Sequence, residues 1–383
     1  NNNNMNFKEY KASLIFRKYN NSKIIIRFIE YKIKNFFLTT LAKLNIFKFN
    51  SKKIIDLGSF RDNSYINYFL FSLKDEYSFT YNNDKNAKKL LRRIGFFNFF
   101  KFTTANSFFK NKKKIKISMN SNEENKKIII DTNYFNYFYN TRNNKTNDIV
   151  MPYFMYPRIY NSFYKKINIL KKPNFNIRVY FSGSINIEGY SNFYWKKEPE
   201  RFPDRIKIIN LIKKEFKSEI FFINSKKDIK SSKFLKKKII FCLHENVIKK
   251  TTYKLNFKEN LNLLGLSCFN LNCPGVVMPL SHHLIEGIKV GSIPITSCNN
   301  LIFPNLNNEN SLIYSNLDEL KNKIHEALNM KEDEIIFKRS KVQDFYKLNL
   351  SPESFKKNFN KIAFDSKSKI ICCDDHRSVK GII

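Results

Sequence analysis

Short apolar runs alternate with helical patterns through the second half of the chain, and this alternation restricts the folds that it can adopt. The apolar runs have the length and composition of buried strands, at residues 177–181, 220–223, 267–271 and 292–295. The segments between them carry apolar residues at helical spacing, at residues 203–216, 256–264 and 281–290. Strands that alternate with helices in this way are typical of a doubly wound parallel sheet. We therefore predict an α/β fold for this half.

The first half shows the same pattern less regularly. Residues 54–58 and 127–131 are apolar runs that end in a turn or a carboxylate, and residues 65–73 have helical spacing. Prolines and tyrosines around residues 151–173 indicate a connection between domains. We predict an N-terminal α/β domain, a C-terminal Rossmann-like domain and a last helix with a tail, over residues 1–165, 175–350 and 351–383.

The chain is strongly basic, with 69 Lys and Arg against 33 Asp and Glu and a net charge of +36. Only 12 of the 69 are Arg, which leaves 57 Lys. Lys, Asn, Ile, Phe and Tyr are enriched together, as in the product of an AT-rich coding sequence. We attribute about half of the basicity to this bias, because selected phosphate recognition favours Arg as well as Lys. The remainder predicts attraction to polyanions.

Two classes of protein are disfavoured by the apolar pattern. No window of about 18 uncharged apolar residues is present, which argues against a transmembrane helix. The N-terminus lacks the apolar stretch of a secretory signal, so we expect the six cysteines to be reduced and the protein to be cytoplasmic. Peripheral attachment to the inner face of a membrane is the alternative. It depends on the basic amphipathic residues 7–50, which would lie on anionic lipid or pack on their own domain.

The segment CCDDH at residues 372–376 contains residue types that bind metals. Adjacent cysteines chelate one zinc ion poorly, and no second ligand pair follows at the spacing of a zinc finger. We therefore predict a strand over residues 369–373 that ends in a polar turn, and no metal site.

The most informative stretch is SCFNLNCPGVVMPLSHHLIEGIKVGSIPITSCNNLIFPNL, residues 267–306. Pro274 and Gly275 end a strand and permit close backbone approach, and Ser281 is placed to cap a helix that begins at His282. His282, Glu286 and Lys289 share one face of that helix on a helical wheel, with its apolar residues opposite. Gly291 is placed to end it.

A helix N-terminus that follows the carboxyl end of a parallel strand is where α/β sheets bind phosphates. Backbone amides there could meet a diphosphate, and Glu286 could accept hydrogen bonds from ribose hydroxyls. The alternatives are a solvated carboxylate for Glu286, and an imidazole in the core or on the surface for His282 or His283.

The same stretch resembles the donor-binding half of GT-B glycosyltransferases, and most closely the bacterial relatives of the exostosin-type family. The likeness covers about residues 175–360. It rests on a family pattern of a small residue, Phe, Leu, Pro-Gly, His, a helical Glu and Gly-x-Ile-Pro. In this chain the pattern is formed, in the same order, by Ser267, Phe269, Leu271, Pro274-Gly275, His282 or His283, Glu286 and Gly291 to Pro294.

The resemblance implies two Rossmann-like domains that face a cleft, with acceptor on the N-terminal side and a nucleotide-sugar donor in the C-terminal domain. It implies that Glu286 holds the ribose. A basic residue near the first strand–turn–helix often meets the pyrophosphate in this family, and Arg205 is the candidate, beside Ser182 and Gly183. An ion pair of Arg205 with Asp204 or Glu215 is the alternative.

Two departures from the family pattern bear on mechanism. Retaining relatives often carry a second Glu eight positions after the first, where this chain has Pro294. An inverting reaction is therefore favoured, which needs a base for the acceptor hydroxyl. Asp131 and Asp56 end strands in the N-terminal half and are our candidates for it, with Asp62 and Glu188 as alternatives. The second departure is that His replaces Arg before Leu284, which makes the diphosphate contact weaker or dependent on pH.

We therefore expect a metal-independent glycosyltransferase that moves a sugar from a nucleotide-sugar to a glycan or lipid-linked acceptor, in surface polysaccharide or lipopolysaccharide synthesis. No Asp-x-Asp motif ends a strand, and no cofactor is expected beyond the nucleotide-sugar co-substrate. One alternative is a basic nucleic-acid-binding protein that uses its aromatic residues for stacking. Another is a catalytically inactive GT-B-like binding module.

Overall fold

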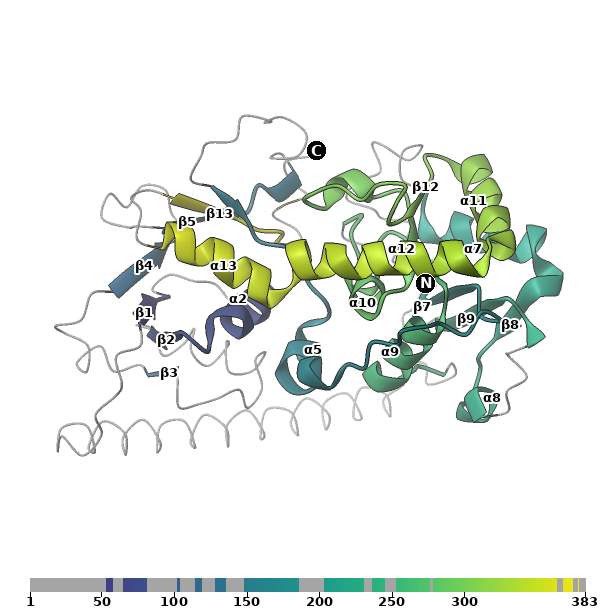
Figure 1. Cartoon of the computed structure of the whole chain (residues 1–383), viewed down its shortest axis with the longest axis horizontal. Helices are drawn as coiled ribbons and strands as arrows, with labels where there is room; N and C mark the ends of the chain where they lie inside the picture. Colours follow the sequence, from purple (N-terminus) through teal and green to yellow (C-terminus); the bar gives the residue numbers. More distant parts are fainter. Residues whose placement is uncertain are drawn as a thin grey trace, which may run out of the picture. The chain divides into compact units, whose positions relative to one another are not determined.

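The computed structural model describes twelve parts of the chain (Figure 1). They are residues 53–57, 65–80, 102–103, 114–118, 128–135, 148–185, 203–230, 236–244, 253–275, 278–363, 368–374 and 378. Several predictions lie outside these residues: the amphipathic segment 7–50 and the alternative bases Asp62 and Glu188. Within the described parts, no helix combines the length and the apolar composition needed to cross a bilayer.

The chain forms two compact units. The first comprises Asn1–Asn63 and Leu73–Ile129, and the second comprises Ser64–Ser72 and Ile130–Ile383. This division falls earlier in the chain than the predicted boundary between residues 165 and 175. The donor and acceptor roles of the two parts stay predictions.

The first unit contains a parallel sheet. Its strands pair in the order β3-β2-β1-β4-β5, with bounds β1 Lys53–Asp56, β2 Tyr77–Thr80, β3 Phe102–Thr103, β4 Lys114–Ser118 and β5 Ile128–Asp131. In the central strand, Ile55 pairs with Phe79 on one side and Ile115 on the other, and all three are buried. The strands predicted from the apolar runs at 54–58 and 127–131 are therefore confirmed as β1 and β5.

The second unit contains a parallel sheet of six strands. Their bounds are β7 Val179–Ser184, β8 Ile220–Phe222, β9 Ile239–His244, β10 Phe269–Leu271, β11 Ile293–Thr296 and β12 Leu312–Ile313. The predicted strands are confirmed here, and β9 is an additional strand that the sequence analysis missed. The α/β class with a Rossmann-like parallel sheet is confirmed.

The strand order is β12-β11-β10-β7-β9-β8, which departs from the usual Rossmann order. The third strand of this sheet, β9, lies between the first and the second, because β8 pairs only with β9. The first strand, β7, still lies in the middle, between β9 and β10. The chain therefore winds to one side after β7 and to the other after β10. This switch point lies between the carboxyl ends of β7 and β10.

Helices cover both sides of this sheet (Figure 1). Helices α9 and α10 pack together, as do α7 and α11, and both α9 and α11 contact β7. The bounds are α7 Arg205–Glu215, α8 Lys226–Lys230, α9 Phe257–Leu266, α10 His282–Val290, α11 Leu317–Asn329 and α12 Glu332–Phe345. Short 3-10 helices are η4 Lys217–Glu219 and η6 Asn299–Leu301.

Local sequence signals explain several of these helix ends. Helix α9 begins with a capping box between Asn256 and Glu259, and α10 ends at Gly291, whose φ of 85° suits glycine. Helix α7 begins one residue after Asp204, which accepts a hydrogen bond from the Lys207 N–H. Pro203 precedes this cap and lies outside the helix, which therefore begins two residues later than the predicted range 203–216.

The remaining elements of the second unit come from parts of the chain that are far apart in the sequence. Its elements are α2 Tyr65–Leu73, β6 Ile149–Val150, α5 Pro157–Ser162, η3 Tyr164–Lys166, the π-helix η7 Tyr346–Leu350, α13 Pro352–Ile362 and β13 Ser368–Ile371. Helix α2 packs on α13 through Phe69, which contacts Phe355 and Phe359. Strand β13 pairs with β6, and the Cys372 N–H donates to the Asp131 carbonyl at 2.8 Å. Ser351 caps α13 and Pro352 begins it, so the predicted last helix is present.

Arg339 of α12 lies in the core, with 1% of its surface exposed. Its guanidinium donates to the carbonyl oxygens of Ser267 at 2.8 Å, Gly265 at 3.1 Å and Val290 at 3.4 Å. The last two lie at the C-terminal ends of α9 and α10, where carbonyl groups have no partner within the helix. Burial lowers the pKa of Arg339 to about 10, which leaves it charged at neutral pH.

We expect Gly287→Ala in α10 to destabilise the protein, because a methyl group there would overlap the side chain of Asn270, whose Cγ is 2.8 Å away. The free energy of unfolding should fall by about 1–3 kcal/mol. Gly265→Ala in α9 is the matched control, since the nearest atom to its methyl group is Val290 Cβ at 3.7 Å. The control should be neutral or stabilise by up to about 1 kcal/mol. Urea denaturation measures both, and equal losses would contradict the packing described here.

Candidate functional site

Arg205 joins the carboxyl ends of β7 and β10 at the switch point of the sheet. Its guanidinium donates to the Ser184 carbonyl at 3.0 Å and to the Cys273 carbonyl at 3.3 Å, and it lies over the ring of Phe181. The predicted neighbours Ser182, Gly183 and Pro274 belong to these same strand ends. The structure therefore brings together the residues predicted to meet a pyrophosphate.

The predicted alternative partners of Arg205 are engaged elsewhere. Asp204 pairs with Lys207 at 3.7 Å, and Glu215 pairs with Lys321 at 2.5 Å. A positive charge at the carboxyl ends of two parallel strands is a favourable place for an anion.

Two glycines allow the chain to approach closely around Arg205. A Cβ atom at Gly183 would lie 2.7 Å from the Phe181 ring and 3.2 Å from Arg205 Nη1. At Gly275 it would lie 2.8 Å from the carbonyl oxygen of Met278. Any larger residue at either position would displace its neighbours, so the prediction of close backbone approach at Gly275 is confirmed.

Helix α10 begins beside the same strand ends. Ser281 holds the N-cap position, but its hydroxyl donates to Asn272 Oδ1 at 2.8 Å and makes no capping bond to the helix. Asn272 in turn donates to Thr296 Oγ1 at 3.0 Å. The prediction of a side-chain cap by Ser281 is therefore wrong, because a buried asparagine competes for its hydroxyl. The positive end of the α10 dipole is not offset by a side-chain cap from Ser281.

His283 lies against β7, with its ring 5.6 Å from Phe181 and 6.0 Å from Tyr180. Both of its ring nitrogens are buried and have no hydrogen-bond partner among the described residues. Burial, with a smaller effect from the charge of Arg205, lowers the pKa of His283 to about 3. His283 is therefore neutral at neutral pH and offers one donor and one acceptor to a bound group.

His244 ends β9 and pairs in register with Ser184 of β7. Burial lowers its pKa to about 4, with smaller effects from Lys254 and Arg205. Its Nδ1 is buried without a hydrogen-bond partner among the described residues. The sequence analysis missed His244 because it missed β9, although a histidine directly after five apolar residues is a usable signal.

The face of α10 that carries His282, Glu286 and Lys289 is covered by the segment Met151–Lys166 of the same unit. His282 Nδ1 is 2.8 Å from the Phe154 carbonyl oxygen, and its ring stacks on Tyr153 at 5.5 Å. The three residues share a face as predicted, but that face packs on protein. His283, the other predicted histidine, is the one that lies beside Arg205 and β7.

Lys289 lies between two tyrosine rings. Its Nζ is 4.7 Å from the centre of Tyr164 and 4.7 Å from that of Tyr346. Burial lowers the pKa of Lys289, and the nearby carboxylate of Glu353 opposes this effect. Cation–π contacts of this kind gain strength when water is excluded, so they stabilise the join between α10, η3 and η7.

Glu286 is 5% exposed and has two hydrogen-bond donors. Tyr156 N–H donates to Oε1 and Asn260 Nδ2 donates to Oε2, each at 3.2 Å. Asn260 is itself held by the hydroxyl of Tyr180, at 2.9 Å. Burial raises the pKa of Glu286 to about 7, and the Tyr156 hydrogen bond limits the rise. Each oxygen therefore has one protein donor and can accept a second hydrogen bond, and the predicted ribose contact stays a prediction.

The two predicted catalytic carboxylates occupy strand ends. Asp56 ends β1 in the first unit and is buried. Asp131 ends β5 and accepts a hydrogen bond from Asn133 N–H at 2.9 Å, with Lys369 Nζ 3.9 Å away. The structure gives no contact of Asp131 with Arg205, His283 or Glu286. The catalytic roles of Asp56 and Asp131 stay predictions.

The six cysteines are all free and buried. Among the residues that the structure describes, no group of three His, Cys, Asp or Glu is arranged to hold a metal ion. Strand β13 ends at Ile371, so Cys372 and Cys373 lie after the strand, whereas the prediction included them in it. Cys373 forms an isolated bridge with Asn133.

Comparisons with known proteins gave one structural likeness to report. No protein-family model matches the chain, and no curated protein matches it. A crystal structure of a mutant of S. aureus TarM, in complex with Fondaparinux, alpha-GlcNAc-glycerol and UDP, matches with 13% sequence identity and a TM-score of 0.34. The match covers 78% of this chain and 58% of that one, so this chain spans less than two thirds of that protein. The predicted likeness to the exostosin-type family stays a prediction.

We expect Glu286→Gln to change how stability depends on pH. Between pH 4.5, the ordinary pKa, and about pH 7 the folded protein keeps a proton that the unfolded chain releases, so stability falls as pH rises through this window. The variant lacks this proton, and its stability relative to the wild type should rise by about 1–3 kcal/mol from about pH 5 to about pH 8. Urea denaturation across this range measures it.

Glu326→Gln is the control, because Glu326 is exposed on α11 and pairs only with Lys323 among the described residues. A difference between wild type and Glu286→Gln that stays constant from about pH 5 to about pH 8 would contradict the buried carboxyl.

Proposed function

We propose that this chain is a glycosyltransferase whose nucleotide-sugar donor binds at the switch point between β7 and β10. The observation that carries the proposal is the position of Arg205, which joins the two strand ends beside which α10 begins. A fixed cation and a helix N-terminus together favour a diphosphate. The resemblance of residues 267–306 to the donor-binding half of GT-B enzymes supports the choice of a nucleotide-sugar.

The buried histidines fit the same ligand. His283 and His244 are neutral at neutral pH, and their buried nitrogens that have no partner among the described residues would gain hydrogen bonds from a bound phosphate or sugar hydroxyl. Leaving such groups without partners costs about 1–3 kcal/mol each, so a ligand that satisfies them binds more tightly.

In the proposed reaction, negative charge develops on the leaving diphosphate. Arg205 and the N-terminal end of α10 would stabilise that charge, which grows as the bond to the sugar breaks. We further propose an inverting, metal-independent transfer to a glycan or lipid-linked acceptor, in surface polysaccharide or lipopolysaccharide synthesis. Pro294, where retaining relatives have a second Glu, supports inversion. A cytoplasmic location and a base from Asp131 or Asp56 belong to this proposal.

Arg205→Gln tests the site. Thermal stabilisation of the full chain by UDP, GDP, CDP, CMP and TDP is compared at high salt without added metal. We expect the wild type to be stabilised selectively, and Arg205→Gln to lose at least about tenfold in affinity because a charge-assisted bond is lost. Lys207→Gln is the matched control, since it removes the same charge from an exposed position two residues along α7.

Three results would contradict the proposed site. One is equal loss in the two variants, and another is stabilisation by every polyanion that disappears with salt. The third is a normal response of Arg205→Gln to the preferred nucleotide.

A further inference from the structure

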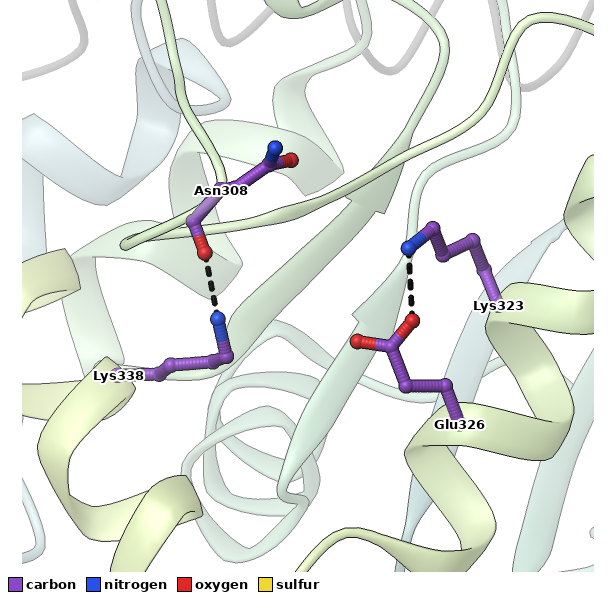
Figure 2. Close-up of polar contacts among 4 residues, drawn as sticks. All are labelled: Asn308, Lys323, Glu326 and Lys338. Atoms are coloured by element: carbon purple, nitrogen blue, oxygen red, sulfur yellow. Dashed lines mark hydrogen bonds and ion pairs between the residues drawn. The ribbon is translucent and has the colours of Figure 1, made fainter.

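The segment that begins in η3 and leads to β7 carries four exposed lysines. Lys165, Lys166, Lys171 and Lys172 are all exposed, and residues 165–172 contain no acid. None of the four has an ion-pair or hydrogen-bond partner for its amine among the described residues. Some lysines elsewhere in the unit do have such partners (Figure 2): Lys323 pairs with Glu326 at 2.7 Å, and Lys338 donates to the Asn308 carbonyl at 2.5 Å. We call residues 165–172 the lysine ribbon.

The lysine ribbon is fixed at both ends. Before it, the Tyr164 hydroxyl accepts a hydrogen bond from the Tyr346 hydroxyl at 3.3 Å. After it, the Asn174 N–H donates to the Leu266 carbonyl at 2.8 Å, and Leu170 lies beside Gly265 of α9. The backbone is therefore held against α9 and η7 at the two ends of a segment whose four lysines are all exposed.

Exposed aliphatic residues accompany these charges. Ile169, in the middle of the ribbon, is 37% exposed, and Leu348 of η7 is 71% exposed. Leu348 lies two residues after Tyr346, the tyrosine that contacts the start of the ribbon, and the exposed Lys347 stands between them. The charge of Lys347 lowers the pKa of Lys289, which lies between the rings of Tyr164 and Tyr346. The positive charge therefore extends from the ribbon to η7.

We propose that the lysine ribbon, with Lys347 and Leu348, docks on a membrane surface that contains anionic lipids. Lysine amines meet headgroup phosphates while their methylene stems and short aliphatic side chains enter the interface. A single-stranded nucleic acid would be met by exposed aromatic rings, whereas Ile169 and Leu348 are aliphatic. A polyanionic glycan offers no apolar phase to receive them. This surface is distinct from residues 7–50 and does not depend on the nucleotide site.

Co-sedimentation of the full chain with vesicles tests this proposal. Vesicles of phosphatidylcholine alone are compared with vesicles that also contain phosphatidylglycerol, and binding is expected only to the second. Replacing Lys165, Lys166, Lys171 and Lys172 together by Gln should weaken that binding by at least about tenfold, since each lysine near an anionic surface contributes to it. Ile169→Ser combined with Leu348→Ser should reduce the binding that persists at high salt.

The matched control replaces four other exposed lysines by Gln, Lys214, Lys217, Lys226 and Lys227 of α7, η4 and α8. It removes the same charge but should keep vesicle binding within about threefold of the wild type. Equal loss in both fourfold variants would overturn the proposal in favour of a general effect of net charge. Equal binding to phosphatidylcholine alone, or no binding to either vesicle, would also overturn it. So would stronger binding to single-stranded RNA or heparin that depends on the same four lysines.

Discussion

Helix α10 is enclosed by protein on both its apolar and its polar side, and the candidate site depends on this enclosure. On the sheet side, Gly287 allows the helix to approach the Asn270 side chain, which donates to the His283 carbonyl at 3.0 Å. On the polar side, the backbone of residues 154–156 contacts His282 and Glu286. The N-terminus of α10 is thereby held at the ends of β7 and β10, because neither side of the helix can shift without losing these contacts.

The electrostatics of the switch point follow from this burial. Arg205 lies near two histidines whose pKa values are lowered mainly by burial, with a smaller contribution from Arg205. The site therefore contains one fixed cation with two neutral imidazoles, an arrangement suited to a ligand that has both a charged and a hydroxyl-bearing part. On the other side of α10, Glu286 has a raised pKa and two donors, so it acts first as a support for Tyr156 and Asn260.

The periodicity of the sequence was enough to predict the second sheet and most of its helices, because parallel strands are buried on both faces and read as continuous apolar runs. The helical face of His282, Glu286 and Lys289 was also predictable from spacing. What covers that face was not, since the contact joins residues more than a hundred positions apart. His244 and the exchanged order of β8 and β9 were missed for a related reason. Strand order is decided by packing between distant segments. A single apolar run in the sequence does not indicate which strands will pair with it.

Hydrogen–deuterium exchange with and without the preferred nucleoside diphosphate tests the central claim most directly, because it locates the ligand along the chain. The account predicts that the nucleotide protects amides at the end of β7, around residues 182–185, and at the start of α10, around residues 282–286. Protection confined to the lysine ribbon or to the first unit, with these two segments unchanged, would contradict it.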